Sequence, residues 1–437
     1  MPSHPLKCWL VLALALWFAG PALAAPPAPI YKFSNGRWWD GVSFQARTVY
    51  SGADARLHDR PPPRVDETID LHGGYVIPPL AEGHNHWLEP AAVDQYNACY
   101  LADGVYYVRD MSNIPLLVDQ FRDKVNLPTS IDFVTSMMPF TGPGAHPVES
   151  LDQFVRLGLL PKDWRPDYDR QGVFIVQTDQ DLRERFAELL LQNPAYVKAF
   201  LLHSEEYTLR QSDPTKYGNH RGMDPALLPR LAKLAHAAHL RLATHVSTAA
   251  DFRNAIAAGA DDIVHLPGNG ASVEPELGFA RYKLNREDAQ SAARHHVTVT
   301  TTLDWLADRN TDWTRQLIEQ VLAPNLRLLK QAGVSILVGS DHFRRSSLGE
   351  VLELRDLNVF TNAELLNMST SRTTQAIFPG RLLGSLADGY EADFLVLERD
   401  PIANLGNLQS ITLRVKQGRR LSVPATALAR SSLDCVP

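Results

Sequence analysis

From residue 81 to about residue 378 the sequence repeats one unit, a short apolar run followed by a stretch with helical periodicity. The clearest helix start has Thr178 and Asp181 in a Thr-x-x-Asp pattern, followed by Leu182, Phe186 and Leu189 on one face. The predicted strands cover residues 104–108, 131–134, 195–200, 241–244, 262–264, 297–300 and 334–339. Such alternation is typical of a parallel sheet covered by helices. We therefore predict an α/β chain with a (β/α)8 TIM-type barrel over residues 81–378.

The segments on either side of this repeat have β character instead. In residues 25–80, apolar runs precede Asn35-Gly36 and Asp40-Gly41, which are hairpin signals. In residues 379–437, apolar runs at 394–397 and 411–416 predict further strands. We interpret the two segments as halves of one small β-sandwich domain.

Residues 1–24 have the pattern of a secretory signal peptide. Lys7 supplies positive charge, residues 9–19 form an apolar core, and Ala22-Leu23-Ala24 is a cleavage site. An uncleaved membrane anchor is the alternative, but the apolar run is short for spanning a bilayer. We expect a secreted, periplasmic protein with no membrane association after cleavage. The mild net charge of −6, without a basic stripe, argues against a nucleic-acid partner.

Two cysteines, Cys99 and Cys435, remain after cleavage of the signal. A disulfide between them is possible in an oxidising compartment. The sequence favours two free or buried thiols, and neither cysteine has the spacing of a metal ligand. Catalysis by cysteine is therefore disfavoured.

Polar residues with metal-binding chemistry lie in or directly after the apolar runs. His84 and His86 are two residues apart on an extended chain, so their imidazoles point to the same side. The full set is His84, His86, Lys198, His245, His265 and Asp341. In a barrel of parallel strands the carboxyl ends meet at one mouth. Imidazole, carboxylate and water suit a divalent ion, so the set predicts a metal site.

Each of these residues also has a simpler interpretation. His84 and His86 could be surface loop histidines, and Lys198 could form an ion pair at the barrel rim. His245 and His265 could be hydrogen-bonded core histidines, and Asp341 could cap a helix. For the metal site to be absent, all of these simpler interpretations would have to be true at once. A shared metal site explains the six residues with one assumption.

The same residues resemble those of the metal-dependent amidohydrolase superfamily, in particular its imidazolonepropionase-like branch, which includes metal-dependent dipeptidases. The motifs that carry the resemblance are Gly73-Gly74-Tyr75-Val76-Ile77-Pro78 leading to His84-Asn85-His86, Gly104-Val105 to Arg109-Asp110, Thr141-Gly142-Pro143-Gly144-Ala145-His146, Val197-Lys198, Thr244-His245-Val246, Asp262-Ile263-Val264-His265, Gly339-Ser340-Asp341 and residues 384–394. One departure is Glu82, where relatives often have an aspartate shortly before His-x-His. We expect Glu82 to affect local packing more than the ligand set.

The resemblance implies two divalent ions per chain. His84, His86 and Asp341 would hold one ion and His245 and His265 the second, with Lys198 bridging them as a carboxylated lysine. Zinc is the default expectation, and Mn²⁺, Fe²⁺ or Co²⁺ would also fit.

The implied activity is hydrolysis of a C–N bond in an amide, a cyclic amide or a dipeptide. Two cations that share a water generate hydroxide near neutral pH, and Asp341 is placed to move its proton to the leaving amine. The same site could serve an esterase, lactonase or phosphotriesterase. A non-catalytic binding barrel is the third possibility, and the intact set of six ligand identities argues against it.

Substrate-binding residues are harder to identify from the sequence. The candidates are His146, His203, Tyr207 and Arg109. His146 lies in a Pro/Gly-rich insertion, residues 139–172, which is long enough for a lid or a binding loop. Arg109 could bind a substrate carboxylate or form an internal ion pair. The expected partner is a small-molecule or dipeptide-like substrate.

Overall fold

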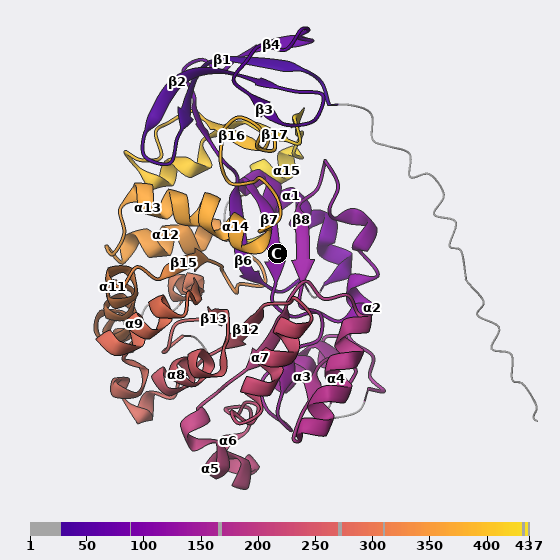
Figure 1. The fold of residues 1–437 in the computed structure, drawn as a ribbon, viewed down its shortest axis with the longest axis vertical. Helices are drawn as coiled ribbons and strands as arrows, with labels where there is room; N and C mark the ends of the chain where they lie inside the picture. Colours follow the sequence, from indigo (N-terminus) through magenta and orange to yellow (C-terminus); the bar gives the residue numbers. More distant parts are fainter. Residues whose placement is uncertain are drawn as a thin grey trace, which may run out of the picture.

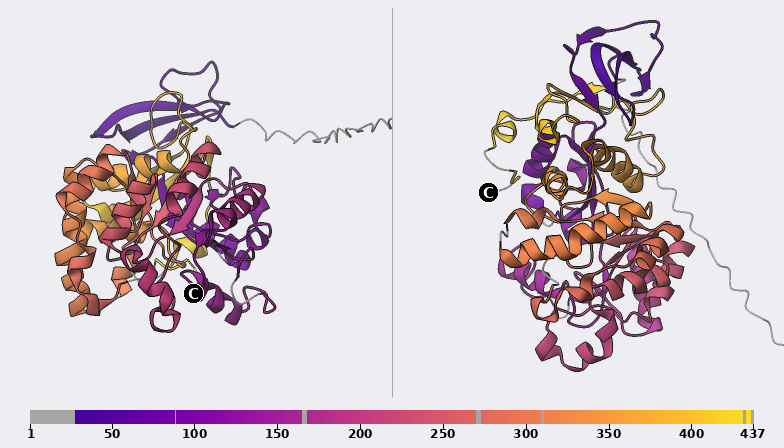
Figure 2. Two further views of the ribbon diagram at one scale, coloured as in Figure 1. Left: turned by 60° about the horizontal axis from the view of Figure 1, so that its bottom comes forward. Right: turned by 90° about the vertical axis from the view of Figure 1, so that its left-hand side faces the viewer.

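The strands of the chain form one mixed sheet and two parallel sheets in the computed structural model, which describes residues 28–87, 89–164, 168–269, 273–308, 311–430 and 433–435. The mixed sheet, built from both ends of the chain, lies at the top of Figure 1, with the parallel sheets and their helices below it. The two rotated views in Figure 2 show the same division. The predicted signal peptide, residues 1–24, lies outside the described residues.

Strands from both ends of the chain join in the mixed sheet. Its order is β18-β17-β16-β5-β1-β2-β3, with β4 paired to β1. The strands are β1 (Tyr31–Trp39), β2 (Phe44–Ser51), β3 (Leu57–His58), β4 (Glu67–Asp70), β5 (Tyr75–Ile77), β16 (Phe394–Leu397), β17 (Ile411–Lys416) and β18 (Arg419–Arg420). Phe394 packs its ring 4.9 Å from Phe33 and 5.2 Å from Trp38. The predicted pairing of the two ends is confirmed, but the sandwich is not, because these strands form one hydrogen-bonded sheet.

All pairs in the other two sheets are parallel, as the alternating pattern predicts. One sheet has the order β6-β7-β8 and the other β10-β9-β11-β12-β13-β14-β15. The strands are β6 (Leu80–Asn85), β7 (Val105–Asp110), β8 (Asp132–Thr135), β9 (Phe140–Thr141), β10 (Phe174–Ile175), β11 (Val197–Phe200), β12 (Leu242–His245), β13 (Asp262–Val264), β14 (Thr298–Thr301) and β15 (Ser335–Val338). The described strands pair as two separate parallel sheets rather than one closed ring. The Asp341 amide donates to the His84 carbonyl at 2.7 Å, which links the ends of β15 and β6.

Helices follow most of the parallel strands, and several begin with a capping box, including the predicted one at Thr178. Thr178 and Thr361 each form a capping box with the residue three positions on, as do Thr248 and Asn285. The helices are α1 (Val93–Asp103), α2 (Pro115–Val118), α3 (Val148–Arg156), α4 (Asp179–Leu191), α5 (Tyr207–Ser212), α6 (Pro214–Tyr217), α7 (Leu228–Ala237), α8 (Ala249–Ala258), α9 (Arg286–Arg294), α10 (Asp312–Leu317), α11 (Ala323–Gln331), α12 (Leu348–Asp356), α13 (Asn362–Asn367), α14 (Thr373–Ile377) and α15 (Ala425–Leu428). None of the helices in the described part of the chain is long and apolar enough to cross a bilayer.

The insertion at residues 139–172 contains α3 and has a small apolar core of its own. Leu151 on α3 packs with Ile114, Leu160 and Tyr168 in a cluster separate from the main core. Gly172 lies directly under Leu151, since an added Cβ there would be 2.7 Å from a Leu151 methyl carbon. Residues 139–164 and 168–172 of the insertion therefore contain a helix packed on an apolar cluster, in contrast to the predicted loop.

The prediction of two free thiols is wrong, because Cys99 and Cys435 form a disulfide with their Cα atoms 5.3 Å apart. The bond ties the C-terminal segment to α1. Beside it, Asp434 accepts a hydrogen bond from Arg345 Nε at 2.7 Å, and the Cys435 amide donates to the Arg344 carbonyl. The segment therefore also holds the loop that follows Asp341.

Breaking this disulfide should lower stability. It closes a loop across 336 residues of sequence, and losing such a crosslink costs about 2–5 kcal/mol. We expect Cys435→Ser, or reduction with a dithiol, to lower the thermal unfolding midpoint by roughly 2–5 °C. Differential scanning calorimetry with and without dithiol measures this. Dithiol should leave Cys435→Ser unchanged, and an equal downward shift in the variant would contradict the assignment.

Candidate active site

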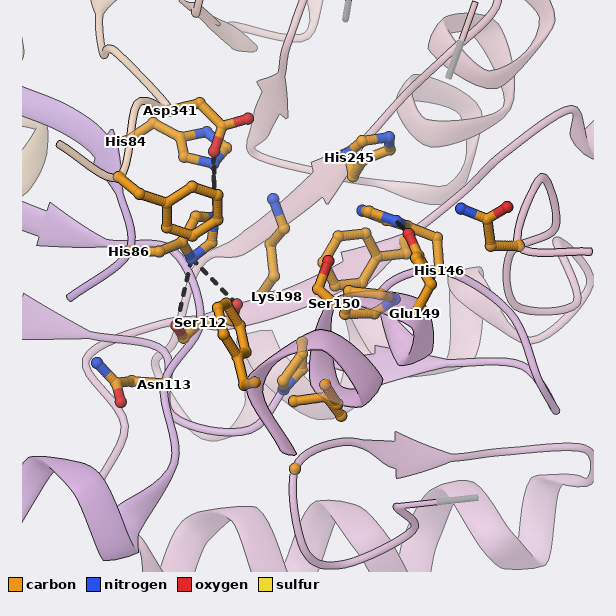
Figure 3. Close-up of a pocket in the computed structure, with 18 of the residues that line it drawn as sticks. His84, His86, Ser112, Asn113, His146, Glu149, Ser150, Lys198, His245 and Asp341 are labelled. Carbon is orange, nitrogen blue, oxygen red and sulfur yellow. Dashed lines mark hydrogen bonds and ion pairs between the residues drawn. The ribbon is translucent and has the colours of Figure 1, made fainter. Parts of the chain in front are cut away.

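The six residues predicted to bind metal line one cavity of about 460 Å³. They lie in or after five strands, with His84 and His86 both at the end of β6, and Figure 3 shows most of them: His84, His86 and Asp341 on one side, His245 on the other, and Lys198 between. The lining residues are His84, His86, Ser112, Asn113, Ile114, Pro139, His146, Pro147, Glu149, Ser150, Leu151, Phe154, Gly172, Lys198, Phe200, Asn219, His245, His265, Asn269, Trp305, Asp341 and Phe343. The predicted convergence of side chains is therefore present.

His84, His86 and Asp341 form the tightest part of the cluster. The Nε2 atoms of His84 and His86 are 3.3 Å apart, and Asp341 Oδ1 is 3.4 Å from the first and 3.3 Å from the second. The other ring nitrogen of His86 faces the backbone carbonyl and hydroxyl of Ser112, both at 3.3 Å. Three donor atoms that meet in this way can hold one cation.

Two glycines allow β6 and β15 to approach closely enough for this contact. A Cβ on Gly339 would lie 2.6 Å from the Cβ of His84, and one on Gly83 would lie 2.6 Å from the carbonyl oxygen of Val338. Side chains at either position would push the two strand ends apart. The short distance between His84 and Asp341 therefore depends on Gly83 and Gly339.

The buried side chain of Glu82 links the same two strand ends by hydrogen bonds. Its carboxylate accepts hydrogen bonds from the His84 amide at 2.9 Å, the Ser340 amide at 2.9 Å and the Ser340 hydroxyl at 2.7 Å. Burial raises the pKa of Glu82 to about 8. Because its oxygens are used by these donors, Glu82 organises the backbone around the cluster, as expected, and is not part of the His84, His86 and Asp341 group.

His245 and His265 lie beside this group. Their ring centroids are 4.4 Å apart, and the His265 ring is 4.6 Å from that of His84. Thr302 Oγ1 at 2.6 Å and Asn269 Nδ2 at 3.0 Å both contact His265 Nδ1, and these two neighbours fix the orientation of the ring. His265 and Asp341 both adopt positive φ angles, 76° and 50°, which is strained for residues with side chains and common at functional sites.

Lys198 is buried in the middle of the cluster. Its Nζ has no hydrogen-bond partner in the described part of the chain and lies 5.0 Å from the centroid of the Phe200 ring. Burial lowers the pKa of Lys198 to about 7, although Asp341 opposes the shift. A buried amine with no acceptor is costly unless another group binds or modifies it.

Burial also lowers the pKa of His84 to about 3, against the opposing effect of Asp341. The pKa values of His245 and His265 are well below the ordinary range for the same reason. These three imidazoles are thus neutral, which is the form that binds metals, whereas Asp341, against the effect of burial, raises the pKa of His86. Histidine nitrogens, a carboxylate and an unpaired buried amine together fit a site for divalent cations.

Of the four predicted substrate-binding residues, only His146 lines the cavity. Its ring is 5.2 Å from that of His245, and its Nδ1 contacts the Glu149 carboxylate. Arg109 lies in the core, where it contacts Asp262 at 2.5 Å and donates to the Gly83 carbonyl at 2.8 Å. The internal ion pair is thus the correct interpretation of Arg109.

His203 and Tyr207 also lie away from the cavity lining. His203 is buried, with Nε2 3.5 Å from Glu274, and Tyr207 begins α5. Neither residue is therefore placed to contact a substrate in this cavity.

Several lining residues were not predicted from the sequence. Ser112 follows the predicted Arg109-Asp110 strand end, and Phe343 is two residues beyond Asp341, so both could have been found by extending those motifs. Glu149 and Phe154 lie on α3 inside the insertion, where no motif marks them. Asn219, Asn269 and Trp305 come from connecting loops without a sequence signal.

One family profile matches this chain, and solved structures share its fold. The profile described as Amidohydrolase family matches residues 98–421, more than half of the chain. Ochratoxinase from A. niger is similar in structure, with a TM-score of 0.70, 16% identity and coverage of 91% of this chain and 96% of that one. A Xaa-Pro dipeptidase solved with bound methionine has a TM-score of 0.69, 17% identity and coverage of 90% and 100%. Phenylurea hydrolase B has a TM-score of 0.65, 16% identity and coverage of 92% and 99%. Among curated proteins, no match was found.

Gly339→Ala should damage the site more than the fold. The added methyl group would have to displace His84, so we expect kcat/KM to fall more than tenfold, with a loss of stability of about 1–3 kcal/mol from overpacking. Activity and metal content per chain are the measurements. Gly380→Ala is the matched control, since a Cβ there meets nothing within 4 Å. Full activity and metal content in Gly339→Ala would show that the close approach is not required.

Proposed function

Because this chain belongs to the amidohydrolase family and is a hydrolase of carbon–nitrogen bonds, we propose that it is a secreted enzyme with two divalent metal ions that cleaves an amide, cyclic amide or dipeptide bond. The observation that carries the proposal is the convergence of six strand-end residues on one cavity. Structures whose names describe a dipeptidase and a phenylurea hydrolase share the fold, which is consistent with a small-molecule substrate.

The two ions would have separate ligand sets. His84, His86 and Asp341 would hold the first, supported by their mutual contacts of 3.3–3.4 Å. His245 and His265 would hold the second, supported by their adjacent rings. Zinc fits these ligands, and Mn²⁺, Fe²⁺ or Co²⁺ would also be accepted.

Lys198 would bridge the two ions after carboxylation. In this reaction the neutral amine attacks CO₂, a C–N bond forms, and one proton is released, so that the product is an anionic carbamate. The proposal is supported by the burial of Lys198 and by the unpaired state of its Nζ within the described structure. A carbamate would replace an uncompensated amine with a ligand for both cations.

When bound, such ions lower the pKa of a shared water and polarise the substrate carbonyl. Asp341 is placed to move the proton: its side chain is 29% exposed, whereas that of His84 is 1% exposed, so its oxygens are open to the cavity. It would accept a proton at Oδ2 and return it to the leaving amine. His146, held at Nδ1 by Glu149, can direct Nε2 toward the substrate carbonyl.

Secretion to the periplasm is part of the proposal. It rests on the signal-like N-terminal sequence, and the Cys99–Cys435 disulfide supports it, because disulfides persist in oxidising compartments.

Asp341→Asn should remove most turnover while leaving the fold intact. The amide cannot accept and return a proton, and loss of a general base typically costs about 10²–10⁴-fold. The measurement is hydrolysis of a panel of N-acyl amino acids, dipeptides and cyclic ureides by protein of known metal content, with circular dichroism as the check on folding.

Asp119→Asn, at an exposed position in the loop after α2, is the control and should keep full activity. Wild-type-like kinetics in Asp341→Asn would contradict its role. Two ions per chain with turnover only on esters, lactones or phosphotriesters would change the assigned bond. A chain without bound metal and without turnover would instead be a binding protein.

A further inference from the structure

One wall of the cavity is formed by α3, which carries none of the six predicted ligands. Glu149, Ser150, Leu151 and Phe154 on this helix line the cavity. Val148 and Val155 on the same helix pack against the small apolar cluster of the insertion. Helix α3 therefore contacts both the cavity and this small apolar cluster, which lies outside the main core.

An aromatic pair closes one end of this wall. The ring of Phe154 is 6.1 Å from that of Phe343 in an edge-to-face arrangement, and the Phe343 ring is 5.6 Å from the ring of His86. Phe343 is 44% exposed, although it is a large apolar side chain. Its backbone is fixed, because Tyr96 donates its hydroxyl hydrogen to the Phe343 carbonyl at 2.9 Å. An apolar group bound here would cover both rings and gain the free energy of its own burial.

The other end of the wall is polar. Glu149, in the first turn of α3, contacts His146, and Asn219 also lines the cavity. Figure 3 shows Glu149 and His146 on the side of the cavity away from His86. A carboxylate at this position attracts hydrogen-bond donors, and an ammonium group most strongly.

The two ends are separated by about one dipeptide. Phe154 is five residues after Glu149 on the helix, which corresponds to about 7.5 Å along its axis. Two residues of extended chain span roughly 7 Å. One small substrate can therefore reach both ends while its central bond lies opposite α3, next to the metal ligands.

Building on the proposed function, we propose that this cavity selects amides with an aromatic or large aliphatic group on one side of the scissile bond and a hydrogen-bond-donating group on the other. The apolar group packs against Phe154 and Phe343, near His86. The donor group binds Glu149, near His245. Substrate specificity is thus determined by Glu149 and Phe154 in the insertion and by Phe343 after Asp341.

Two matched pairs of probes test the apolar end. They are glycyl-phenylalaninamide with glycyl-alaninamide, and phenylacetyl-glycinamide with acetyl-glycinamide, so that the apolar group is tried on both sides of the bond. We expect the aromatic member of at least one pair to have a kcat/KM about tenfold or more above its partner, from the burial of one ring. Phe154→Ala should lower this ratio about tenfold, and Phe154→Leu should restore part of it.

Leu157→Ala is the matched control, because Leu157 is the exposed residue that ends α3 and does not line the cavity. It should keep the wild-type ratio. If Phe154→Ala unfolds, Phe343→Ala provides the same test from the other side of the pair. An unchanged ratio in a folded variant, or a wild-type preference for the methyl probes, overturns the proposal.

Glu149→Gln tests the polar end. Wild-type enzyme should prefer glycyl-phenylalaninamide to its N-acetylated form, and the variant should lose most of this preference, mainly through KM. Equal preference in both enzymes would contradict a role for Glu149 in binding the donor group. Metal-loaded enzyme that cleaves none of these probes contradicts the substrate class, whereas protein that binds no metal contradicts the proposed function itself.

Discussion

The close approach of β6 and β15 is the constraint on which the rest of the site depends. The first parallel strand and the last are distant in sequence, yet the His84 and Asp341 side chains lie 3.4 Å apart. Gly83 and Gly339 remove the side chains that would keep the strand ends apart, and Glu82 satisfies the donors that this contact would otherwise leave buried. Burial raises the pKa of Glu82 to about 8, so keeping this carboxyl group in the core costs free energy. It lies where it fixes the backbone of His84 and Ser340, next to the predicted ligands.

The site also gathers unfavourable features that no purely structural role explains. Lys198 Nζ and His84 Nδ1 are buried without hydrogen-bond partners in the described structure, and each such atom costs about 1–3 kcal/mol. His265 and Asp341 adopt left-handed backbone conformations after β13 and β15. Native structures contain few buried unsatisfied groups, and strain of this kind persists where function requires it. Carboxylation of Lys198 would remove the cost of its unpaired nitrogen, since the modified group would have cations as partners.

The convergence of these side chains could be predicted because parallel strands bring their carboxyl ends to one place, so order along the chain is enough to identify His84, His245 and Asp341 as neighbours. The parallel α/β core follows from the same periodicity. Arg109 shows the limit, since its partner Asp262 is on another strand and only the assembled structure reveals the ion pair. The Cys99–Cys435 disulfide could not be predicted for the same reason, because its two cysteines are 336 residues apart in sequence. The sandwich prediction failed because hairpin signals identify strands without saying whether they join one sheet or two.

The residues that would select the substrate were the hardest to predict from the sequence, and the structure gives a physical reason. Ligands sit on strands of the main core, where burial imposes a strong apolar pattern and any change in packing moves the ligands as well. Helix α3 packs on a small apolar cluster separate from the main core, so Glu149 and Phe154 lie outside the apolar pattern of the strands, although Phe154 still reaches His86 through Phe343. The regular apolar spacing that sequence analysis uses is therefore weak at these positions of α3. A wall built from a helix outside the strands would allow one set of strand-end residues to serve different substrates, because binding sites vary most readily in segments outside the core scaffold.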